Sequence, residues 1–233
     1  LNEINKDLSS PHKMFRLLQG DVGSGKTIVS LLAAINSINS GFQVAFMAPT
    51  EILARQHFML AKKIFPKNIN IDLISGKSEY KLKKEIHKKL ENSKIDIIFG
   101  THAIFQKKII FKKLGLIIID EQHKFGVNQR KRLSDKGGPN CDVLLMTATP
   151  IPRTLTMTIY GDMDISIIRE KPKNRKPIKT YSKLEAKIED VLKFIKKEIN
   201  IGNQIFWVCP LIEESKKLDH SSAVKKYEYL QSK

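Results

Sequence analysis

The segment Gly20–Thr27, GDVGSGKT, constrains the fold of this chain more than any other part of the sequence. It fits the pattern G-x-x-x-x-G-K-[ST], follows the apolar run Phe15–Gln19 and precedes a stretch with helical spacing, Lys26–Asn39. In that context the pattern forms a phosphate-binding loop, because its glycines let backbone N–H groups turn towards phosphate oxygens. The following helix points the positive end of its dipole at the same anion. The segment therefore predicts an α/β domain that presents this loop at the end of a strand.

Every residue of the loop is expected to line a nucleotide site. These residues are Gly20, Asp21, Val22, Gly23, Ser24, Gly25, Lys26 and Thr27. Lys26 is expected to reach the β- and γ-phosphates, and the Thr27 hydroxyl to bind Mg²⁺. The expected cofactors are therefore ATP and Mg²⁺.

Short apolar runs alternate with segments of helical spacing over the first two thirds of the chain. Strands are expected at Phe15–Gln19, Gln43–Ala48, Asn70–Ile74, Asp96–Gly100, Leu116–Asp120 and Val143–Thr147, and helices at Lys26–Asn39, Glu51–Phe65, Lys77–Glu91 and Asn128–Asp135. The strands are apolar almost throughout, as expected when helices cover both faces of a sheet. This alternation predicts a parallel, doubly wound sheet.

The character of the sequence changes after the last of these elements. The stretch Arg169–Thr180 is charged, contains two prolines and shows no periodicity, which is typical of a linker. A helix at Leu184–Asn200 and a strand at Gln204–Cys209 are expected next. One such unit is too small to bury a sheet. We therefore predict a first domain at 1–168, a linker at 169–183 and the truncated start of a second domain at 184–233.

The chain is strongly basic, with 41 Lys and Arg against 24 Asp and Glu and a formal net charge of +17. Such a charge is typical of proteins that bind a polyanion, most often nucleic acid. The alternative is a compositional bias, because the chain is rich in Lys, Ile and Asn and its Lys runs resemble solvated helix faces.

Composition also excludes several classes of protein. With 41% hydrophobic residues the bulk of the chain is not intrinsically disordered. No apolar run approaches the roughly 18–20 residues of a membrane-spanning helix. Cys141 and Cys209 form no C-x-x-C pair, so we expect no structural zinc and a reducing, cytoplasmic compartment. The first residues, LNEINKDLSS, lack both an initiator Met and a signal peptide, so we expect a fragment or a processed piece.

A second chemical motif follows the apolar run Leu116–Asp120. Asp120 and Glu121 end this run, and Gln122 and His123 come next. Carboxylates at the carboxyl end of a parallel strand lie where ligands bind in such folds. Asp120 is suited to hold Mg²⁺, and Glu121 to orient or deprotonate the attacking water. The alternative is a charged strand end that caps a helix, and His123 either senses the nucleotide or simply packs.

A third motif, Thr147-Ala148-Thr149-Pro150, also follows an apolar strand. Its two hydroxyls can bridge the γ-phosphate site and a neighbouring domain by hydrogen bonds. A hydroxyl-closed turn that ends at the proline is the alternative.

In chain order, the phosphate loop, Ala48–Glu51, Gly100–His102, Asp120–His123 and Thr147–Pro150 resemble motifs I, Ia, Ib, II and III of superfamily 2 helicases. The longer strings are similar to RecG-type ATP-dependent DNA helicases; they are LLQGDVGSGKT, MAPTEILARQH, GTHAIFQ, DEQHKFGVNQR, MTATPIPRTL and VCPLIEESKKLD. Transcription-repair coupling translocases share the IPRTL segment but usually carry Asp-Glu-Glu-Gln at motif II, and they fit less well.

The resemblance implies two RecA-like domains that hydrolyse ATP to move along double-stranded DNA and remodel replication forks and Holliday junctions in repair and recombination. It implies contacts to the DNA backbone from Pro49, Thr50, Thr101 and His102, and coupling of nucleotide state to domain movement by Thr147 and Thr149. Arg153 either touches a phosphate or holds a local acid. The expected partner is branched or duplex DNA, the expected site of action the bacterial nucleoid, and the expected state a monomer.

RecG-type proteins also carry a wedge domain, an adenine-reading glutamine and an arginine in motif VI, and none of these is found in this sequence. The resemblance therefore implies that the chain alone is inactive as a motor. Two alternatives stay open at this point: a nucleotide-binding module without turnover, and an ATPase that acts on protein. The basic charge and the motifs Ia and Ib argue against the protein substrate.

Overall fold

The computed structural model describes residues 1–76, 80–106, 108–121, 138, 141–149, 163–170, 177–209 and 223–231. Contacts divide the chain into two compact units, Leu1–Arg175 and Lys176–Lys233, and each is described by itself. The predicted helix at Asn128–Asp135 lies outside the described residues.

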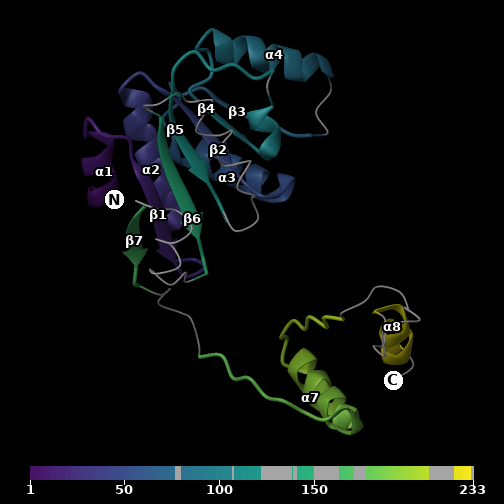
Figure 1. Ribbon diagram of the computed structural model, residues 1–233. Helices are drawn as coiled ribbons and strands as arrows, with labels where there is room; N and C mark the ends of the chain where they lie inside the picture. Colours follow the sequence, from purple (N-terminus) through teal and green to yellow (C-terminus); the bar gives the residue numbers. More distant parts are fainter. Residues whose placement is uncertain are drawn as a thin grey trace. The chain divides into compact units, whose positions relative to one another are not determined.

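The first unit is built on a parallel sheet (Figure 1). Its strands are β1 (Phe15–Gly20), β2 (Gln43–Met47), β3 (Ile71–Ile74), β4 (Ile97–Gly100), β5 (Leu114–Ile119), β6 (Asp142–Thr147) and β7 (Asp164–Ile168). They lie in the order β3-β4-β2-β5-β6-β1-β7, and each pair of neighbours is parallel. The predicted α/β fold with a parallel sheet is confirmed.

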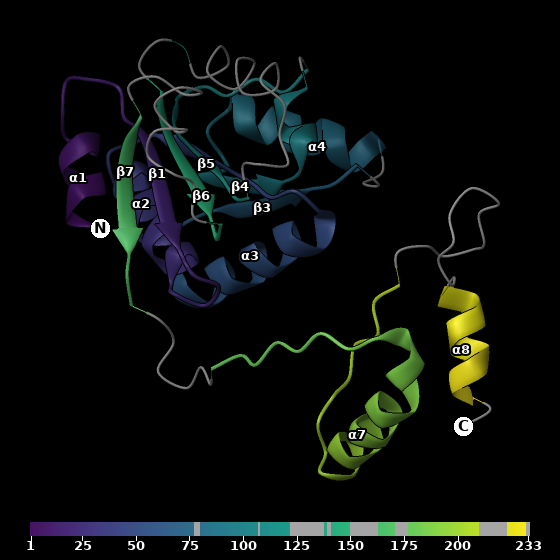
Figure 2. The same ribbon diagram turned by 60° about the horizontal axis from the view of Figure 1, so that its bottom comes forward.

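Helices cover both faces of this sheet (Figure 2). The helical elements of the unit are α1 (Asn2–Leu8), α2 (Lys26–Asn39), α3 (Glu51–Ile64), α4 (Tyr80–Glu91) and the short 3₁₀ helix η1 (His102–Phe105). Ile4 of α1, Leu31 of α2 and Ala61 of α3 belong to one hydrophobic cluster. Ile86 of α4 and Ile104 of η1 belong to the other. The doubly wound arrangement is therefore confirmed as well.

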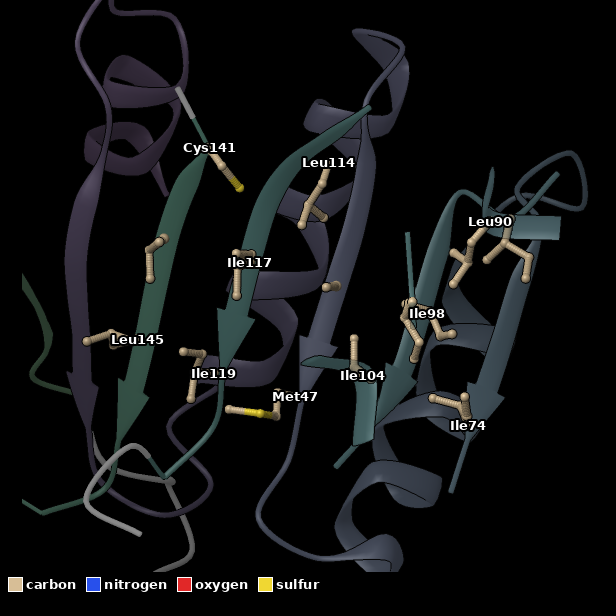
Figure 3. Packing of buried hydrophobic residues seen from close by; sticks show 14 of the residues in the cluster. Met47, Ile74, Leu90, Ile98, Ile104, Leu114, Ile117, Ile119, Cys141 and Leu145 are labelled. Carbon is tan, nitrogen blue, oxygen red and sulfur yellow. The ribbon is translucent and has the colours of Figure 1, made fainter. Parts of the chain in front are cut away.

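Side chains of each strand alternate between the two clusters, because successive residues of a strand point to opposite faces. In β5, Ile117 and Ile119 enter the cluster under α4, which Figure 3 shows, and Leu116 and Ile118 enter the cluster under α2 and α3. A strand that is buried on both faces needs apolar residues at every position. This explains the unbroken apolar runs in the sequence.

Two elements of the first unit, α1 and β7, were absent from the sequence-based prediction, and both pack around Arg16 of β1. The Arg16 guanidinium is buried, and its Nε donates to Asp7 of α1 at 2.6 Å. Its Nη1 donates to Ser166 of β7 at 2.9 Å, and Ser166 in turn donates to Glu3 of α1. The free-energy cost of burying a charged side chain in β1 is thus offset by partners on other elements. These partners cannot be recognised from the residues next to Arg16 in the sequence.

Gln43 at the start of β2 is a second buried polar side chain that ties distant segments together. Its amide nitrogen donates to the carbonyls of Leu90 and Ile95, at 3.0 and 2.9 Å. Its carbonyl accepts from the backbone N–H groups of Lys112 and Lys113. Without Gln43 these backbone donors and acceptors would have neither water nor a protein group as a hydrogen-bond partner. Gln43 therefore links the segments that lead into β4 and β5.

The second unit contains η3 (Glu185–Lys187), α7 (Ile188–Asn200) and α8 (Ala223–Gln231). The predicted helix at Leu184–Asn200 is confirmed except that its first turn is a 3₁₀ helix. The predicted strand at Gln204–Cys209 is wrong, because these residues join no ladder and Phe206 is 87% exposed. A strand requires hydrogen bonds to a neighbour, and the described part of this unit holds no other strand. In the described part of the chain, no helix is long and apolar enough to cross a membrane.

Candidate active site

The loop Gly20–Lys26 connects the end of β1 to the start of α2. Gly23 and Gly25 have φ angles of 78° and 96°, in the left-handed region that side chains rarely adopt. Gly25 caps α2, and its carbonyl accepts the first helical hydrogen bond, from Val29. The glycines of the motif are therefore required by backbone geometry, and they aim the amino end of a helix at the space over the loop.

The loop folds back tightly on the end of β1. A Cβ on Gly20 would lie 2.6 Å from the Oγ of Ser24 and 3.1 Å from the Cβ of Ile168, so a side chain there would force Ser24 to move. The Ser24 Oγ is itself buried and has no hydrogen-bond partner among the described residues. A buried hydroxyl without a partner, in a loop that leads into the amino end of a helix, fits an anionic ligand that accepts hydrogen bonds. The residues present thus fit a nucleotide phosphate.

Lys26 is the cation of this loop. Its Nζ donates to the carbonyl oxygens of Gly20 and Asp21, at 2.7 and 2.9 Å, and so lies across the mouth of the loop. Thr27 follows in the first turn of α2 and is half-buried, with its carbonyl bonded by the Ser30 hydroxyl at 2.8 Å. Both side chains predicted to meet the phosphates and Mg²⁺ are therefore at the amino end of one helix. Asp21 and Val22 form the tip, and Val22 is exposed.

The other predicted motifs follow strands that are consecutive neighbours in the sheet. In register, Gly100 pairs with Met47, Met47 with Ile119, Ile119 with Leu145, and Gln19 with Thr147. The chain therefore places the ends of β4, β2, β5, β6 and β1 side by side along one edge. Neighbouring strands lie about 4.8 Å apart, so β5 and β1 are separated by about 10 Å. That span suits a carboxylate that acts on a metal bound to the phosphates in the loop.

Asp120 follows β5 and is buried, and its backbone N–H donates to the carbonyl of Met47 at 2.9 Å. Glu121 has a φ of 49°, which is unusual for any residue other than glycine. Such a conformation persists where the surroundings demand it, and it is concentrated at functional sites. The structure therefore places both predicted acids at the edge that carries the loop, and the backbone changes direction abruptly at Glu121.

His57 of α3 is a site residue that the sequence-based prediction missed. Its Nε2 lies 2.8 Å from the Oδ2 of Asp120, and both side chains are buried. Its ring also packs on Phe46 of β2, with 4.8 Å between ring centroids. One signal was present in the sequence: Ala54, His57 and Ala61 occupy the buried face of α3, where a polar residue requires a partner.

Thr147 ends β6 between the acids and the loop. Its buried Oγ1 accepts from the backbone N–H of Thr149 at 3.2 Å and lies 2.9 Å from the Thr149 hydroxyl. This is the hydroxyl-closed turn that the sequence left as an alternative. The turn and a coupling role are compatible, because the motif still stands between β5 and β1.

The residues predicted to contact DNA also lie at this edge, with different exposures. Thr50 is exposed, caps α3 and accepts from the N–H of Leu53 at 3.3 Å, and Pro49 before it is half-buried. Thr101 is buried, whereas His102 at the start of η1 is exposed.

Four other predicted residues, Gln122, His123, Pro150 and Arg153, lie outside the described residues. No group of three or more His, Cys, Asp or Glu that could hold a metal is found in the described part of the chain; Mg²⁺ in nucleotide sites needs only one or two carboxylates beside the phosphates.

Residues 3–158 match the family model described as DEAD/DEAH box helicase. The "ATP-dependent DNA helicase RecG" of Bacillus subtilis is 49% identical over 231 residues, which are 99% of this chain and 34% of the relative. The protein of the same name from Thermotoga maritima is 48% identical over 229 residues, 98% of this chain and 29% of the relative. The chain thus spans about a third of the length of these curated relatives.

Among solved structures, "Structure of RecG bound to three-way DNA junction" matches with a TM-score of 0.79 and 40% identity, over 99% of this chain and 30% of that one. The resemblance to RecG-type proteins that the sequence motifs indicated is therefore confirmed.

Proposed function

The chain belongs to the DEAD/DEAH box helicase family, and on that basis we propose that it is the ATP-binding part of an ATP-dependent DNA helicase that remodels branched DNA. The observation that carries this proposal is the succession of motif-bearing strand ends along one edge of the sheet, from β4 to β1. The phosphate loop, the two acids and the two segments proposed to contact the DNA backbone all follow strands that end at this edge, which supports a site for one nucleotide beside one nucleic acid strand. Replication forks and Holliday junctions are the proposed substrates.

In the proposed chemistry the amino end of α2 and the Lys26 ammonium bind the β- and γ-phosphates. Thr27 and Asp120 are the proposed residues that hold Mg²⁺, which when bound neutralises charge that develops on the phosphates. Glu121 orients the attacking water and accepts its proton. Thr147 and Thr149 belong to the motif between the acids and the loop. They couple the state of the γ-phosphate to domain movement.

The proposed DNA contacts are to the sugar–phosphate backbone. Thr50 and His102 present exposed polar groups at the ends of β2 and β4, and Pro49 and Thr101 shape those ends. Contacts of this kind position a protein on DNA without reading its sequence. The RecG relative bound to a three-way junction and the net charge of +17 support this partner.

We further propose the domain division 1–168, 169–183 and 184–233, with the last segment as the start of a second RecA-like domain. In phosphate-loop enzymes an arginine supplied by another domain or protein is worth about 10³–10⁵ in rate, so we expect the full-length protein to hydrolyse ATP faster than this chain. The proposed protein is a monomer that works at the nucleoid in the cytoplasm.

The test is ATP hydrolysis and junction unwinding by the full-length gene product, with Glu121→Gln as the matched blank. We expect turnover that branched DNA stimulates and that the blank lacks. Nucleotide binding without turnover would support a binding module, and equal stimulation by plain duplex without unwinding would support a coupling-type translocase. Stimulation by protein alone would contradict a DNA motor.

A further inference from the structure

His57 lies at the carboxyl edge of the sheet and faces Asp120 across the space between α3 and β5. The Nε2–Oδ2 distance of 2.8 Å is that of a hydrogen bond. When the carboxylate is ionised it has only acceptor sites, and the ring nitrogen is then the donor. Of the two acids in the motif, His57 therefore holds the one that the proposed function assigns to Mg²⁺.

The placement of His57 cannot be accounted for by packing alone. Its side chain is 11% exposed and packs against Phe46, which stacks on Phe99 at 5.0 Å in the core. An apolar side chain would fill this position without the cost of taking an imidazole out of water. The hydrogen bond to Asp120 is what offsets that cost.

We propose that His57 is a positioning residue for the Asp120 carboxylate. By bonding Oδ2, the ring restricts the orientation of the carboxylate, whose other oxygen would then be the one that holds the metal. Outer partners of this kind orient metal-binding side chains, and their loss typically lowers metal affinity about 10- to 100-fold. This role rests on the proposed function, because it presupposes that Asp120 acts on a metal.

The helix that carries His57 is fixed independently of this bond. Thr50 caps its amino end, and Ala54 and Ala61 bury its inner face. Asp120 is fixed in its turn through its backbone bond to Met47. Because both partners are held by their own elements, the bond between them sets a side-chain orientation and is not needed to build either element.

The test uses the ratio of dissociation constants of the fluorescent nucleotide mant-ADP without and with Mg²⁺, measured on the 233-residue chain. His57→Gln places an amide N–H where Nε2 stands, whereas His57→Leu fills the space and cannot donate. Phe58→Leu is the matched control, because Phe58 lies on the same helix and packs edge-on against Phe99 in the core. Thermal unfolding of each variant reports on folding.

We expect His57→Leu to weaken the Mg²⁺-dependent part of binding by about tenfold or more and to leave binding without Mg²⁺ unchanged. His57→Gln should restore most of the loss, and Phe58→Leu should lower the melting temperature only. If His57→Leu does not fold, His57→Asn replaces it, because its shorter amide cannot reach Asp120.

An unchanged Mg²⁺ dependence in a folded His57→Leu or His57→Asn variant would overturn the positioning role and leave the proposed function standing. Equal losses in His57→Leu and Phe58→Leu would also overturn it. If Mg²⁺ does not change the dissociation constant of the nucleotide for the parent chain, both the proposed function and the positioning role are contradicted.

Discussion

The guanidinium of Arg16 on β1 lies 2.6 Å from the carboxylate of Asp7 on α1. The Arg16 side chain is 9% exposed and the Asp7 side chain 21%, so the pair is largely removed from solvent. The same guanidinium bonds Ser166 of β7, on the strand that also pairs with β1. The strand that leads into the phosphate loop is thus tied to both α1 and β7 by one side chain.

Arg16→Met should destabilise the first unit by about 2 kcal/mol, since hydrogen bonds to charged groups contribute roughly 1.5–3 kcal/mol. Urea unfolding measures the loss. Arg55→Met is the control, because Arg55 is 63% exposed and its pair with Glu51 spans 3.8 Å; exposed pairs contribute about 0–1 kcal/mol. Equal effects of the two substitutions would contradict a structural role for the Arg16 network.

Substitutions of the two acids after β5 should impair different steps, namely Mg²⁺-dependent binding and hydrolysis. Asp120→Asn should weaken Mg²⁺-dependent nucleotide binding, because a neutral group replaces a charged ligand of a hard cation. Glu121→Gln should leave that binding intact and slow hydrolysis by about 10²–10⁴-fold in the full-length protein, because the amide cannot accept a proton. Nucleotide titrations and phosphate release separate the two effects. The same defect in both variants would refute the division of roles.

Burial raises the pKa of the Cys141 thiol to about 12, against an ordinary value of 9.0. At pH 8 its thiolate is then roughly 10³-fold scarcer than that of an ordinary thiol, and it should resist a thiol-directed reagent while Cys209, in the second unit, reacts.

The folded state holds the Cys141 proton more tightly than the unfolded state, so this thiol lowers the free energy of unfolding as pH rises from about 9 towards 12. Cys141→Ala should remove that part of the alkaline loss in denaturation curves taken across this range. Rapid labelling of both cysteines at pH 8 would contradict the burial.

DNA binding by the chain should depend steeply on salt and hardly on sequence. Counterion release gives a log–log slope of about −0.9 for each phosphate neutralised on duplex DNA. Titrations of two unrelated duplexes at several salt concentrations measure the slope and the sequence preference together. A flat slope would mean that the charge of +17 reflects composition and not a DNA partner.

Local patterns predicted most of the elements in the first unit, because their information is contained in a few adjacent residues. An unbroken apolar run identifies β5, and the glycines and Lys26 identify the loop that follows β1. β7 escaped prediction because it lies at the edge of the sheet, and of its residues Asp164–Ile168 only Ser166 is buried, so it lacks the unbroken buried apolar run of the inner strands. The strand expected at Gln204–Cys209 shows the converse: an apolar run forms no strand in the described part of a unit that offers no neighbour.

The candidate site was predictable as a set of motifs but not as a geometry. The order of strand ends along the sheet edge, with β6 between β5 and β1, follows from the register of distant pairs. The contact of His57 with Asp120 joins residues 63 positions apart. Spacing along the chain encodes neither, because the order of the strand ends depends on which strands pair, and the contact of His57 with Asp120 depends on how α3 packs on the sheet that contains β5.

The central claim is that the loop Gly20–Thr27 binds a nucleotide through Lys26, and the most direct test is a mant-ATP titration of the 233-residue chain against its Lys26→Ala variant. Removal of a charged donor to phosphate should cost about 1.5–3 kcal/mol, or roughly 10- to 100-fold in the dissociation constant. Matching melting curves would show that the variant keeps the fold. Saturable binding by the parent and its loss at this magnitude in Lys26→Ala are the predicted result; equal affinity in the two chains would contradict the account.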